Sequence, residues 1–492
     1  MTTRRWLFAD QLGPQFLDGP DQTALLVESR AAFGRRRYHR AKAHLLLSGL
    51  RHRALELGDR AVFLQVDTYD EALRRLGPEP LSVVQPTSWA ADRYVRDRGV
   101  EVVAEGRGFA TTREDFAGWV GGRRRLLMED FYRWQRQRFG VLMDGDEPTG
   151  GRWNLDHDNR EPPPKRPTLG IADPWLVQED EVDAQVREDL DRWQRDGHVD
   201  LVGHDRPRWA AVTRDEALAA LAHFVEHRLP GFGPSEDAML SADPWMAHSV
   251  LSPALNLGLL HPLECATAAE QAYREGHAPL NSVEGYVRQV LGWREYVWSV
   301  YWHVPEDYRH RNALAATADL PGWFRSLDAE QEVTANCLSS VLRDLRERGW
   351  VHHILRLMVL GGYALQRGWD PRQVTDFFHD SFVDGYDWVM LPNVTGMSQH
   401  ADGGLMATKP YTGGGAYIDR MSDYCGDCVF DPKVRVGANA CPYTAGYWWF
   451  MDRHREKFAA NPRMRRAVLG LDRLRDLDAL LVQEERRGSS AP

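Results

Sequence analysis

Tyr424-Cys425-Gly426-Asp427-Cys428 is the stretch that constrains this fold most, because two thiolates at Cys-x-x-Cys spacing can bind one metal centre. Cys337 lies far upstream of it, and Cys441 follows it, directly before Pro442. Four thiolates complete a tetrahedral site, so these separate segments are predicted to meet in space. A disulfide framework is not indicated, because the fifth cysteine, Cys265, would be left unpaired.

Spacing alone does not identify the metal. A set of four cysteines suits a structural zinc ion and an iron–sulfur cluster alike, and zinc sites are the more frequent of the two. Both alternatives therefore stay open at the level of the cysteine pattern.

Composition limits the class of protein. The 492 residues suffice for two or three domains, and the net charge of −10 argues against a nucleic-acid-binding surface along the whole chain. Mean hydropathy is −0.50, and no apolar run of about 18 residues is present, so we expect no membrane span. The start MTTRRWLFADQ runs into a strand-like segment and does not resemble a signal peptide. We therefore expect a soluble cytoplasmic protein and, by default, a monomer.

The N-terminal region alternates short β-rich runs with helical stretches such as Tyr38–Leu57, a rhythm typical of a parallel α/β sheet. No G-x-G-x-x-G motif follows the first run, so a standard dinucleotide-binding fingerprint is absent. The region is therefore predicted to be a Rossmann-like domain without that fingerprint. Its predicted strands are Trp6–Ala9, Leu25–Glu28, Ala61–Val66, Leu81–Gln85 and Val100–Ala104.

The rest of the chain is predicted to be linker and helices. Residues 144–175 are rich in Pro, Gly and Asp and are typical of an inter-domain linker. Helical periodicity dominates after it, as in Asn281–Trp302, Gln331–Arg348 and Val351–Arg367. We divide the chain into an α/β domain at 1–140, a linker with helices at 141–230 and a large helical domain at 231–492.

Several segments, most of them in the helical part, carry a family pattern: Gly150–Asn154, His248–Pro253, Gly285–Tyr296, Trp350–Arg356, Asp384–Trp388, Thr408–Tyr411 and Tyr417–Cys425. Together they resemble the FAD-binding half of photolyases and cryptochromes. The cysteine pattern narrows the resemblance to the iron–sulfur bacterial cryptochromes and (6-4) photolyases, over nearly the whole chain. The resemblance implies a [4Fe-4S] cluster bound by Cys337, Cys425, Cys428 and Cys441.

The resemblance also implies FAD in the helical domain. The hydroxyls of Ser249 and Ser252 lie near a predicted helix start, where pyrophosphate oxygens bind readily, although ordinary N-capping explains such serines too. Arg294 can add a charge-assisted contact to phosphate. Asp384 and Asp387 are three residues apart and could share a helix face. The full predicted set is Ser249, Leu251, Ser252, Gln289, Trp293, Arg294, Asp384 and Asp387.

Adjacent histidines, His352 and His353, supply the candidate acid–base chemistry. Histidine titrates near neutrality and can deliver a proton during bond cleavage. Neighbouring residues on a helix point about 100° apart, so one histidine is expected to face the substrate while the other supports it. By resemblance, His353 transfers the proton and His352 supports it, Tyr411 and Tyr417 line the substrate pocket, and UV-damaged DNA is the partner.

The residues at the positions of the family's electron-transfer relay differ from the family pattern. Ala329 and the pair Phe377-Phe378 stand where the subgroup places the Trp and the Trp-Tyr pair of its electron relay to the flavin. Phenylalanine is much harder to oxidise than tryptophan or tyrosine, so this relay is expected to fail. Met390 stands where relatives place a glutamate beside the flavin.

The antenna residues are only partly present. Asp10 and Glu28 fit the site of a lumazine antenna in the resemblance, whereas Ala32 replaces a carboxylate expected there. A lumazine antenna is therefore a weak expectation.

Two functions follow from this pattern. The favoured one is light-driven repair of (6-4) photoproducts, in which the damaged base is flipped out of the DNA. The alternative is a photolyase-like enzyme that acts on a small molecule, in light or in darkness, and keeps the histidines as acid–base groups. A signalling cryptochrome is less favoured, because the flavin relay is interrupted.

Overall fold

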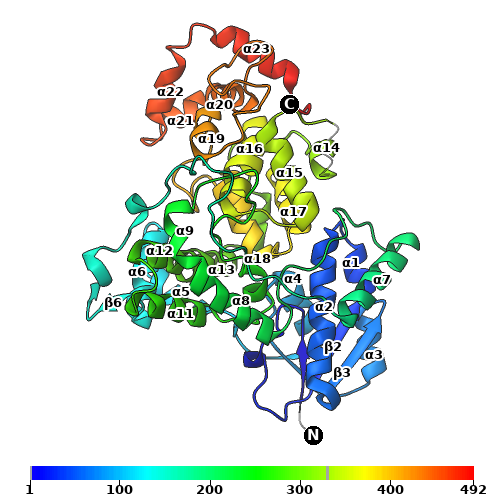
Figure 1. The fold of residues 1–492 in the computed structure, drawn as a ribbon. Coiled ribbons are helices and arrows are strands. Elements are labelled where there is room, and N and C mark those ends of the chain that lie inside the picture. The colour runs from blue at the N-terminus through cyan, green and yellow to red at the C-terminus, as the bar shows by residue number, and fades with distance from the viewer. Residues whose placement is uncertain (1–2, 328–331) are drawn as a thin grey trace.

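In the computed structural model of the protein, residues 3–327 and 332–492 are described, so Ala329 lies outside the described residues. The chain forms an N-terminal α/β part and a larger helical part (Figure 1). The C-terminal helices lie at the end of the molecule opposite the N-terminus. The predicted combination of a parallel α/β sheet with a helical domain is confirmed.

A five-stranded parallel sheet forms the centre of the α/β part, with strand order β3-β2-β1-β4-β5. β1 pairs with β2 on one side and with β4 on the other, so the strand order reverses at β1. All predicted strands are present, with small shifts at their ends. The strands are β1 (Arg4–Leu7), β2 (Ala24–Ser29), β3 (Ala61–Val66), β4 (Leu81–Val84) and β5 (Glu101–Ala104).

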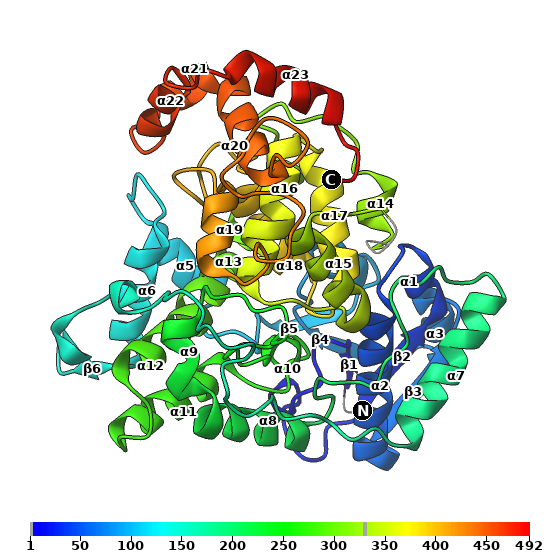
Figure 2. The same ribbon diagram turned by 45° about the horizontal axis from the view of Figure 1, so that its top comes forward.

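Helices connect these strands. The predicted helix at Tyr38–Leu57 is confirmed as α2 (Arg40–Leu57). α7 (Glu181–Arg195), which comes from the predicted linker, packs beside α2 (Figure 2). The other helices of this region are α1 (Arg30–Gly34), α3 (Tyr69–Leu76), α4 (Trp89–Asp97), α5 (Arg113–Val120) and α6 (Met128–Phe139).

No single residue in the sequence separates the α/β part from the helical part, because elements on each side of the predicted boundaries pack on the other part. α5 and α6 precede residue 140 but contact α13 (Glu295–His303) and the π-helix η5 (Arg288–Arg294) of the helical part. α7 belongs to the predicted linker but packs on the α/β part. The division at residues 140 and 230 therefore stays a prediction.

The segment between α6 and α7 has little regular structure, as its composition indicates. It contains a short antiparallel pair and two 3-10 turns: β6 (Met143–Asp144), β7 (Glu147–Pro148), η3 (Thr149–Gly151) and η4 (Asp156–Asp158).

Within the described residues, the helical part is built from short helices, three of which are π-helical. π-Helical turns are rare and occur frequently at functional sites. Besides η5 they are η7 (Leu355–Gly361) and η8 (Leu391–Ser398). The α-helices besides α13 are α8 (Arg214–His227), α9 (Leu229–Ser235), α10 (Ser252–Asn256), α11 (Pro262–Arg274), α12 (Leu280–Val287), α14 (Gly322–Arg325), α15 (Asn336–Arg348), α16 (Gly362–Arg367), α17 (Pro371–Ser381), α18 (Asp387–Met390), α19 (Gly415–Met421), α20 (Pro442–Arg453), α21 (Arg455–Ala459), α22 (Arg465–Leu471) and α23 (Leu477–Arg487); η6 (Glu306–His310) is a 3-10 turn.

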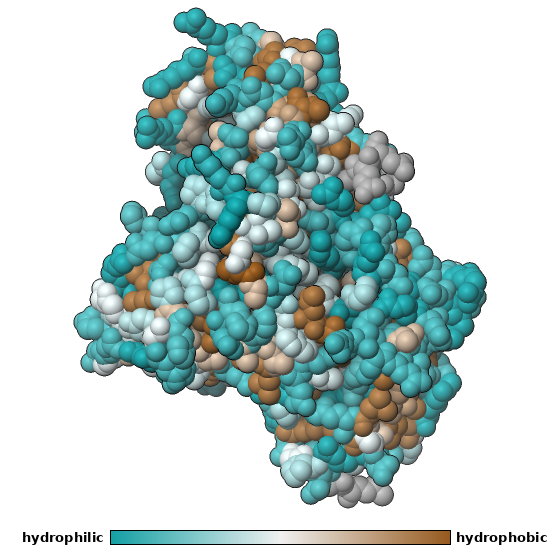
Figure 3. All heavy atoms as spheres, viewed as in Figure 1, coloured by the Kyte–Doolittle hydropathy of each residue, from teal (hydrophilic) through white to brown (hydrophobic). Residues whose placement is uncertain are grey.

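The face of the molecule in Figure 3 is mainly hydrophilic, with hydrophobic side chains in small scattered groups. Among the described residues, no helix is both long and apolar enough to cross a membrane.

His39 joins the two parts at the start of α2. Its Nδ1 accepts a hydrogen bond from Ala41 N at 3.1 Å, and its Nε2 donates to Arg346 O at 3.1 Å. The backbone N–H of His39 donates to Asp380 O, so the beginning of α2 meets the end of α17. The His39 side chain is fully buried, and this burial lowers its pKa to about 4.

We expect His39 to make the folded state sensitive to acid. Because its pKa is lower in the folded than in the unfolded chain, the unfolded chain binds a proton first, and stability is lost as the pH falls from about 6.5 towards 4. One such proton corresponds to a slope of about 1.4 kcal/mol per pH unit. Urea unfolding of wild type and of His39→Asn, which keeps a capping acceptor but does not titrate, measures this slope. Equal pH dependence of the two proteins would contradict the assignment.

Candidate functional site

Asp384 is the centre of a buried network that joins three predicted segments. Both of its carboxylate oxygens accept from Arg356, at 2.8 and 3.0 Å, and Ser252 Oγ donates to it at 2.7 Å. Asn256 Nδ2 donates to the Asp384 carbonyl at 3.1 Å. The side chain of Asp384 is about 5% exposed. The structure therefore brings together Ser252 and Asp384, two of the residues predicted to bind FAD.

Asp387 belongs to another set of contacts. It accepts a hydrogen bond from Tyr301 Oη at 2.7 Å and forms an ion pair with Arg309 at 3.1 Å. Asp384 lies in the turn before α18, whereas Asp387 is the first residue of α18. The prediction that the two acids share a helix face is therefore wrong, and a flavin contact of Asp387 stays a prediction.

The loop from Ser249 to Leu251 has an unusual backbone. Val250 has φ of 51°, a conformation that β-branched residues rarely adopt, and Leu251 returns to a right-handed conformation. Such alternation turns successive backbone N–H groups towards one side, where they can bind an anion. Backbone strain of this kind is typical of ligand-binding loops. The loop is therefore suited to the predicted pyrophosphate contact.

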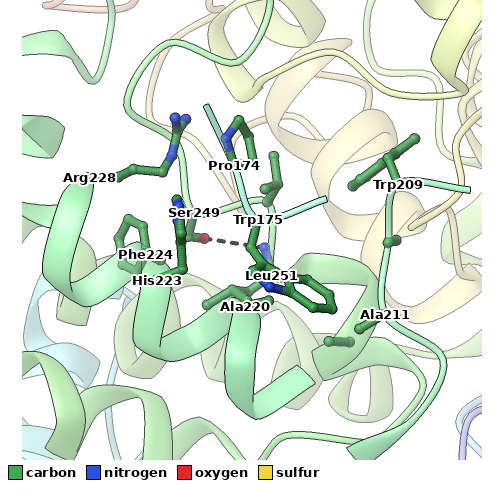
Figure 4. Close-up of a pocket in the computed structure, with 13 residues that line it drawn as sticks. Pro174, Trp175, Trp209, Ala211, Ala220, His223, Phe224, Arg228, Ser249 and Leu251 are labelled. Atoms are coloured by element: carbon green, nitrogen blue, oxygen red, sulfur yellow. Dashed lines mark hydrogen bonds between the residues drawn. The ribbon is translucent and has the colours of Figure 1, made fainter. Parts of the chain in front are cut away.

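A pocket lies against this loop (Figure 4). Ser249 and Leu251 face it, and Leu251 N donates to Ser249 Oγ at 3.4 Å. Trp175 of the linker and Trp209 form other parts of the wall. Arg228 is buried behind the loop, where it donates to the backbone carbonyl of His248 at 3.1 Å.

The predicted residues of η5 point in different directions. Gln289 Nε2 donates to Glu236 Oε1 at 2.7 Å. Trp293 packs in a small apolar cluster that also contains Tyr411. Arg294 lies on the other side, where it pairs with Glu295 at 3.0 Å, and its Nε has no hydrogen-bond partner among the described residues.

The two predicted histidines differ sharply in environment. His352 is about 1% exposed, and its ring stacks on that of His248 with centroids 4.6 Å apart. His353 is the first helical residue and reaches solvent, whereas His352 lies just before the helix. The expectation that both are helical is wrong, but the expectation that only one faces a pocket agrees with this difference in exposure.

The protein around His353 keeps its imidazole neutral. Desolvation, together with the positive charge of Arg356, lowers the pKa of His353 to about 4. His248 and His352 are also held neutral by burial, and each has a buried ring nitrogen without a partner among the described residues. A negative charge close to His353 would raise its pKa and favour the protonated imidazole.

Several charged groups near Tyr417 were not predicted. Arg160 forms an ion pair with Asp156 at 3.1 Å and lies 3.6 Å from Asp237. Burial raises the pKa of Glu236 to about 7, and its Oε2 has no partner among the described residues. Adjacent acids such as Glu236 and Asp237 normally indicate a solvated surface, so no local signal marks them. Tyr417 is half-buried, and its burial raises its pKa.

The four predicted metal-binding cysteines line one pocket, as their spacing requires: Cys337, Cys425, Cys428 and Cys441. They come from the first turn of α15, the loop after α19 and the N-cap of α20. Burial and the other three thiols raise the pKa of Cys337 well above its usual value. Gly415 leaves room for the site, because a Cβ there would lie 2.7 Å from Cys441 Sγ. The fifth cysteine, Cys265, is buried elsewhere.

The sulfur atoms are spread more widely than the ligands of one ion. Among the described residues, His52, Asp180 and Asp183 are the set of three metal-ligating side chains whose ligand atoms all lie within 4.8 Å of one another. This set contains no cysteine, so no three of the four sulfurs lie that close together. Zn–S bonds of about 2.3 Å would place four sulfurs about 3.8 Å apart. The spacing thus suits a larger centre better than a single zinc ion.

Phe377 and Phe378, at the positions where the resemblance places part of a relay, are buried. Phe377 and Phe378 belong to an aromatic group with Phe324, and Met390 is also in the core. Other aromatic chains are present: Trp350 contacts Trp245, whose ring centroid is 5.2 Å away.

The two predicted antenna residues differ in whether their carboxylates are free to bind a ligand. Glu28 forms a bidentate ion pair with Arg51, at 2.9 and 2.8 Å, so its carboxylate is already satisfied. Asp10 accepts from Thr87, but its Oδ1 is buried without a partner among the described residues, as is Tyr386 Oη. A polar ligand at Asp10 could form hydrogen bonds with Asp10 Oδ1 and Tyr386 Oη. The carboxylate of Glu28 is already occupied by Arg51 and cannot bind such a ligand in the same way.

The comparisons with known proteins agree with the family resemblance of the sequence. Residues 5–200 match the family described as deoxyribodipyrimidine photo-lyase-related protein. A (6-4) photolyase of Agrobacterium fabrum is 39% identical over 483 residues, which cover 93% of this chain and 93% of that protein.

A solved structure of a bacterial class III photolyase from Agrobacterium tumefaciens has the same fold, with a TM-score of 0.52 and 20% identity, over 80% of this chain and 79% of that chain. Its likeness supports the fold alone. The identity to the Agrobacterium fabrum protein extends over nearly the whole length of both, and on this ground the chain belongs to the family of the bacterial (6-4) photolyases.

Proposed function

We propose that this protein binds FAD and a [4Fe-4S] cluster and repairs (6-4) photoproducts in DNA in a light-driven reaction. The observation that carries the proposal is the arrangement of His353, which is exposed to solvent and lies near Arg356, the partner of the buried Asp384. The related Agrobacterium fabrum protein is named a (6-4) photolyase, which supports the same substrate class.

The residues present are compatible with FAD. The strained Ser249–Leu251 loop offers backbone N–H groups to phosphates, and Arg294 Nε and His352 Nδ1 are buried polar atoms in need of a partner. Ser252, Trp293 and Asp384 would hold the rest of the cofactor. Bound reduced FAD would supply the electron that light drives into the lesion.

His353 would handle the proton. Its imidazole is neutral in the protein alone, and a nearby anion would raise its pKa, since an opposite charge favours the protonated form. A phosphodiester of the damaged strand brings such a charge. His352, stacked on His248, would fix the orientation of the neighbouring His353, and the hydroxyls of Tyr411 and Tyr417 would contact the flipped base.

The cluster would have a structural role. Its proposed ligands connect α15 to α20, and thiolates buried without a positive centre would be costly, as the raised pKa of Cys337 indicates. Iron would compensate that charge.

A second function is favoured by one specific observation. The surroundings of Tyr417 contain three acids, Asp156, Glu236 and Asp237, and two arginines, Arg160 and Arg420, while Arg288 also pairs with Asp156. These surroundings have no excess of positive charge that would favour a phosphodiester backbone, and they suit a small neutral molecule equally well. The alternative is therefore a photolyase-like enzyme with a small substrate, which uses the same histidines.

We expect anaerobically purified protein to be brown and to contain about four irons and four sulfides per chain. Cys425→Ser is expected to reduce soluble yield, because the cluster connects separate segments. Cys265→Ser is the matched control and should keep full iron. Stoichiometric zinc without sulfide would exclude the cluster.

We expect slow reduction of oxidised FAD under blue light with a thiol donor, because Phe377 and Phe378 interrupt the family's relay. Absorbance near 450 nm follows the reaction. Trp at positions 329 and 377 together should accelerate it. Fast reduction in wild type would show another route, and its loss in Trp350→Phe would place that route through Trp350 and Trp245.

We expect His353→Ala to reduce turnover by about a hundredfold or more while FAD content and thermal stability stay nearly unchanged, because general acid–base catalysis is lost. His352→Ala should cost less. Each variant is assayed on DNA with a (6-4) lesion in light and on candidate small molecules in darkness. Activity in the DNA assay supports repair; a flavin-loaded wild type without it favours the alternative. Unchanged rates in both variants would exclude the acid–base assignment.

A further inference from the structure

Lys42 reaches from the α/β part into the helical part. It lies on α2, is about 4% exposed, and its Nζ donates to His379 O at 2.5 Å and to Gly385 O. His379 lies in the last turn of α17, where backbone carbonyls have no partner within the helix. The Lys42 ammonium therefore caps the C-terminal end of α17, the end that attracts positive charge.

The same ammonium holds the turn that carries Asp384. Gly385 follows Asp384 directly, and its backbone N–H donates to Phe382 O, so the turn is tight. Gly385 has no room for a side chain, since a Cβ there would lie 2.5 Å from His379 O. Lys42 thus bonds both ends of the segment between α17 and Asp384.

Lys42 has no ion-pair partner among the described residues, although Asp380 and Asp384 are near enough to favour its charge. Arg36 opposes that charge, and the rings of Tyr38 and Tyr386 lie 5.1 and 5.8 Å from its Nζ. His379 is held neutral by burial and by Lys42 itself. Burial lowers the pKa of Lys42 to about 7.

We propose that Lys42 is a positioning residue through which the α/β part sets the place of Asp384, and with it the affinity for FAD. This inference rests on the proposed binding of FAD. Without the ammonium, the carbonyls of His379 and Gly385 lose their donor in a buried place, and the turn relaxes. Asp384 then shifts relative to Arg356 and Ser252, which it bonds.

Three variants test the inference: Lys42→Met, Lys42→Arg and the control Arg53→Met. Arg53 is also a buried cation of α2, but it pairs with Glu56 on its own helix. Equilibrium dialysis measures FAD binding at pH 6.5 and 8.5. Loss of two hydrogen bonds to a charged donor predicts about tenfold or weaker binding for Lys42→Met. Lys42→Arg should restore most of the affinity, and Arg53→Met should resemble wild type.

The pH profile separates positioning from general stability. Wild type should bind FAD less tightly at pH 8.5 than at pH 6.5, as Lys42 loses its charge, whereas Lys42→Arg should show little change. Wild-type affinity in Lys42→Met, or an equal loss in Arg53→Met, would overturn the inference.

Hydrogen exchange of the flavin-free protein gives a readout that does not depend on FAD. Lys42→Met should exchange faster in residues 382–386, and Arg53→Met should not. If wild type binds no FAD, the proposed function fails, while this measurement still decides whether Lys42 holds the turn. Unchanged exchange in Lys42→Met would overturn its positioning role.

Discussion

The ion pair of Arg356 with Asp384 is the interaction on which the candidate site depends. It joins η7, which follows the histidines, to the turn before α18, and through Ser252 it reaches α10. Burial of such a pair is costly unless its hydrogen bonds are satisfied, and here Ser252 Oγ and the Val351 carbonyl provide them. Removal of either charge would leave the other buried and unpaired. Segments far apart in the sequence are thus fixed around one carboxylate.

A second constraint acts at the other end of the helical part. Thiols from α15, the loop after α19 and the start of α20 line one pocket, and among the described residues no three of their sulfurs lie within 4.8 Å of one another. A larger centre would cross-link these elements, in the way that a disulfide limits an unfolded chain. Tyr443, which lines the cysteine pocket, donates to the Val359 carbonyl of η7, and Arg356 at the start of η7 bonds Asp384, so both sites contact the same helix.

The residues that differ from the family pattern share one chemical property, which is that their side chains are apolar and hard to oxidise or ionise. Phe377, Phe378 and Met390 fill the core with side chains that neither transfer electrons readily nor titrate. His353 remains open, and His352 and His248 remain stacked behind it. The chain thus has histidines where the resemblance places a proton-handling site, and it lacks oxidisable side chains at the relay positions that the resemblance implies. Such a site would serve repair if FAD is reduced by a route other than this relay. It would serve a light-independent reaction on a small molecule equally well.

The sequence by itself determined the fold class and the strands of the sheet, because β-rich periodicity is a local property. It also predicted that the four cysteines converge, because the Cys-x-x-Cys pair needs two further thiolates to complete a metal site. It also indicated the histidine pair. Only the tertiary structure decided that Asp384 and Asp387 serve different networks, that Glu28 is occupied by Arg51, and that Glu236 and Lys42 are buried beside the site. Burial and pairing depend on residues brought together from distant segments, and no local pattern records which partner a carboxylate or an ammonium will meet.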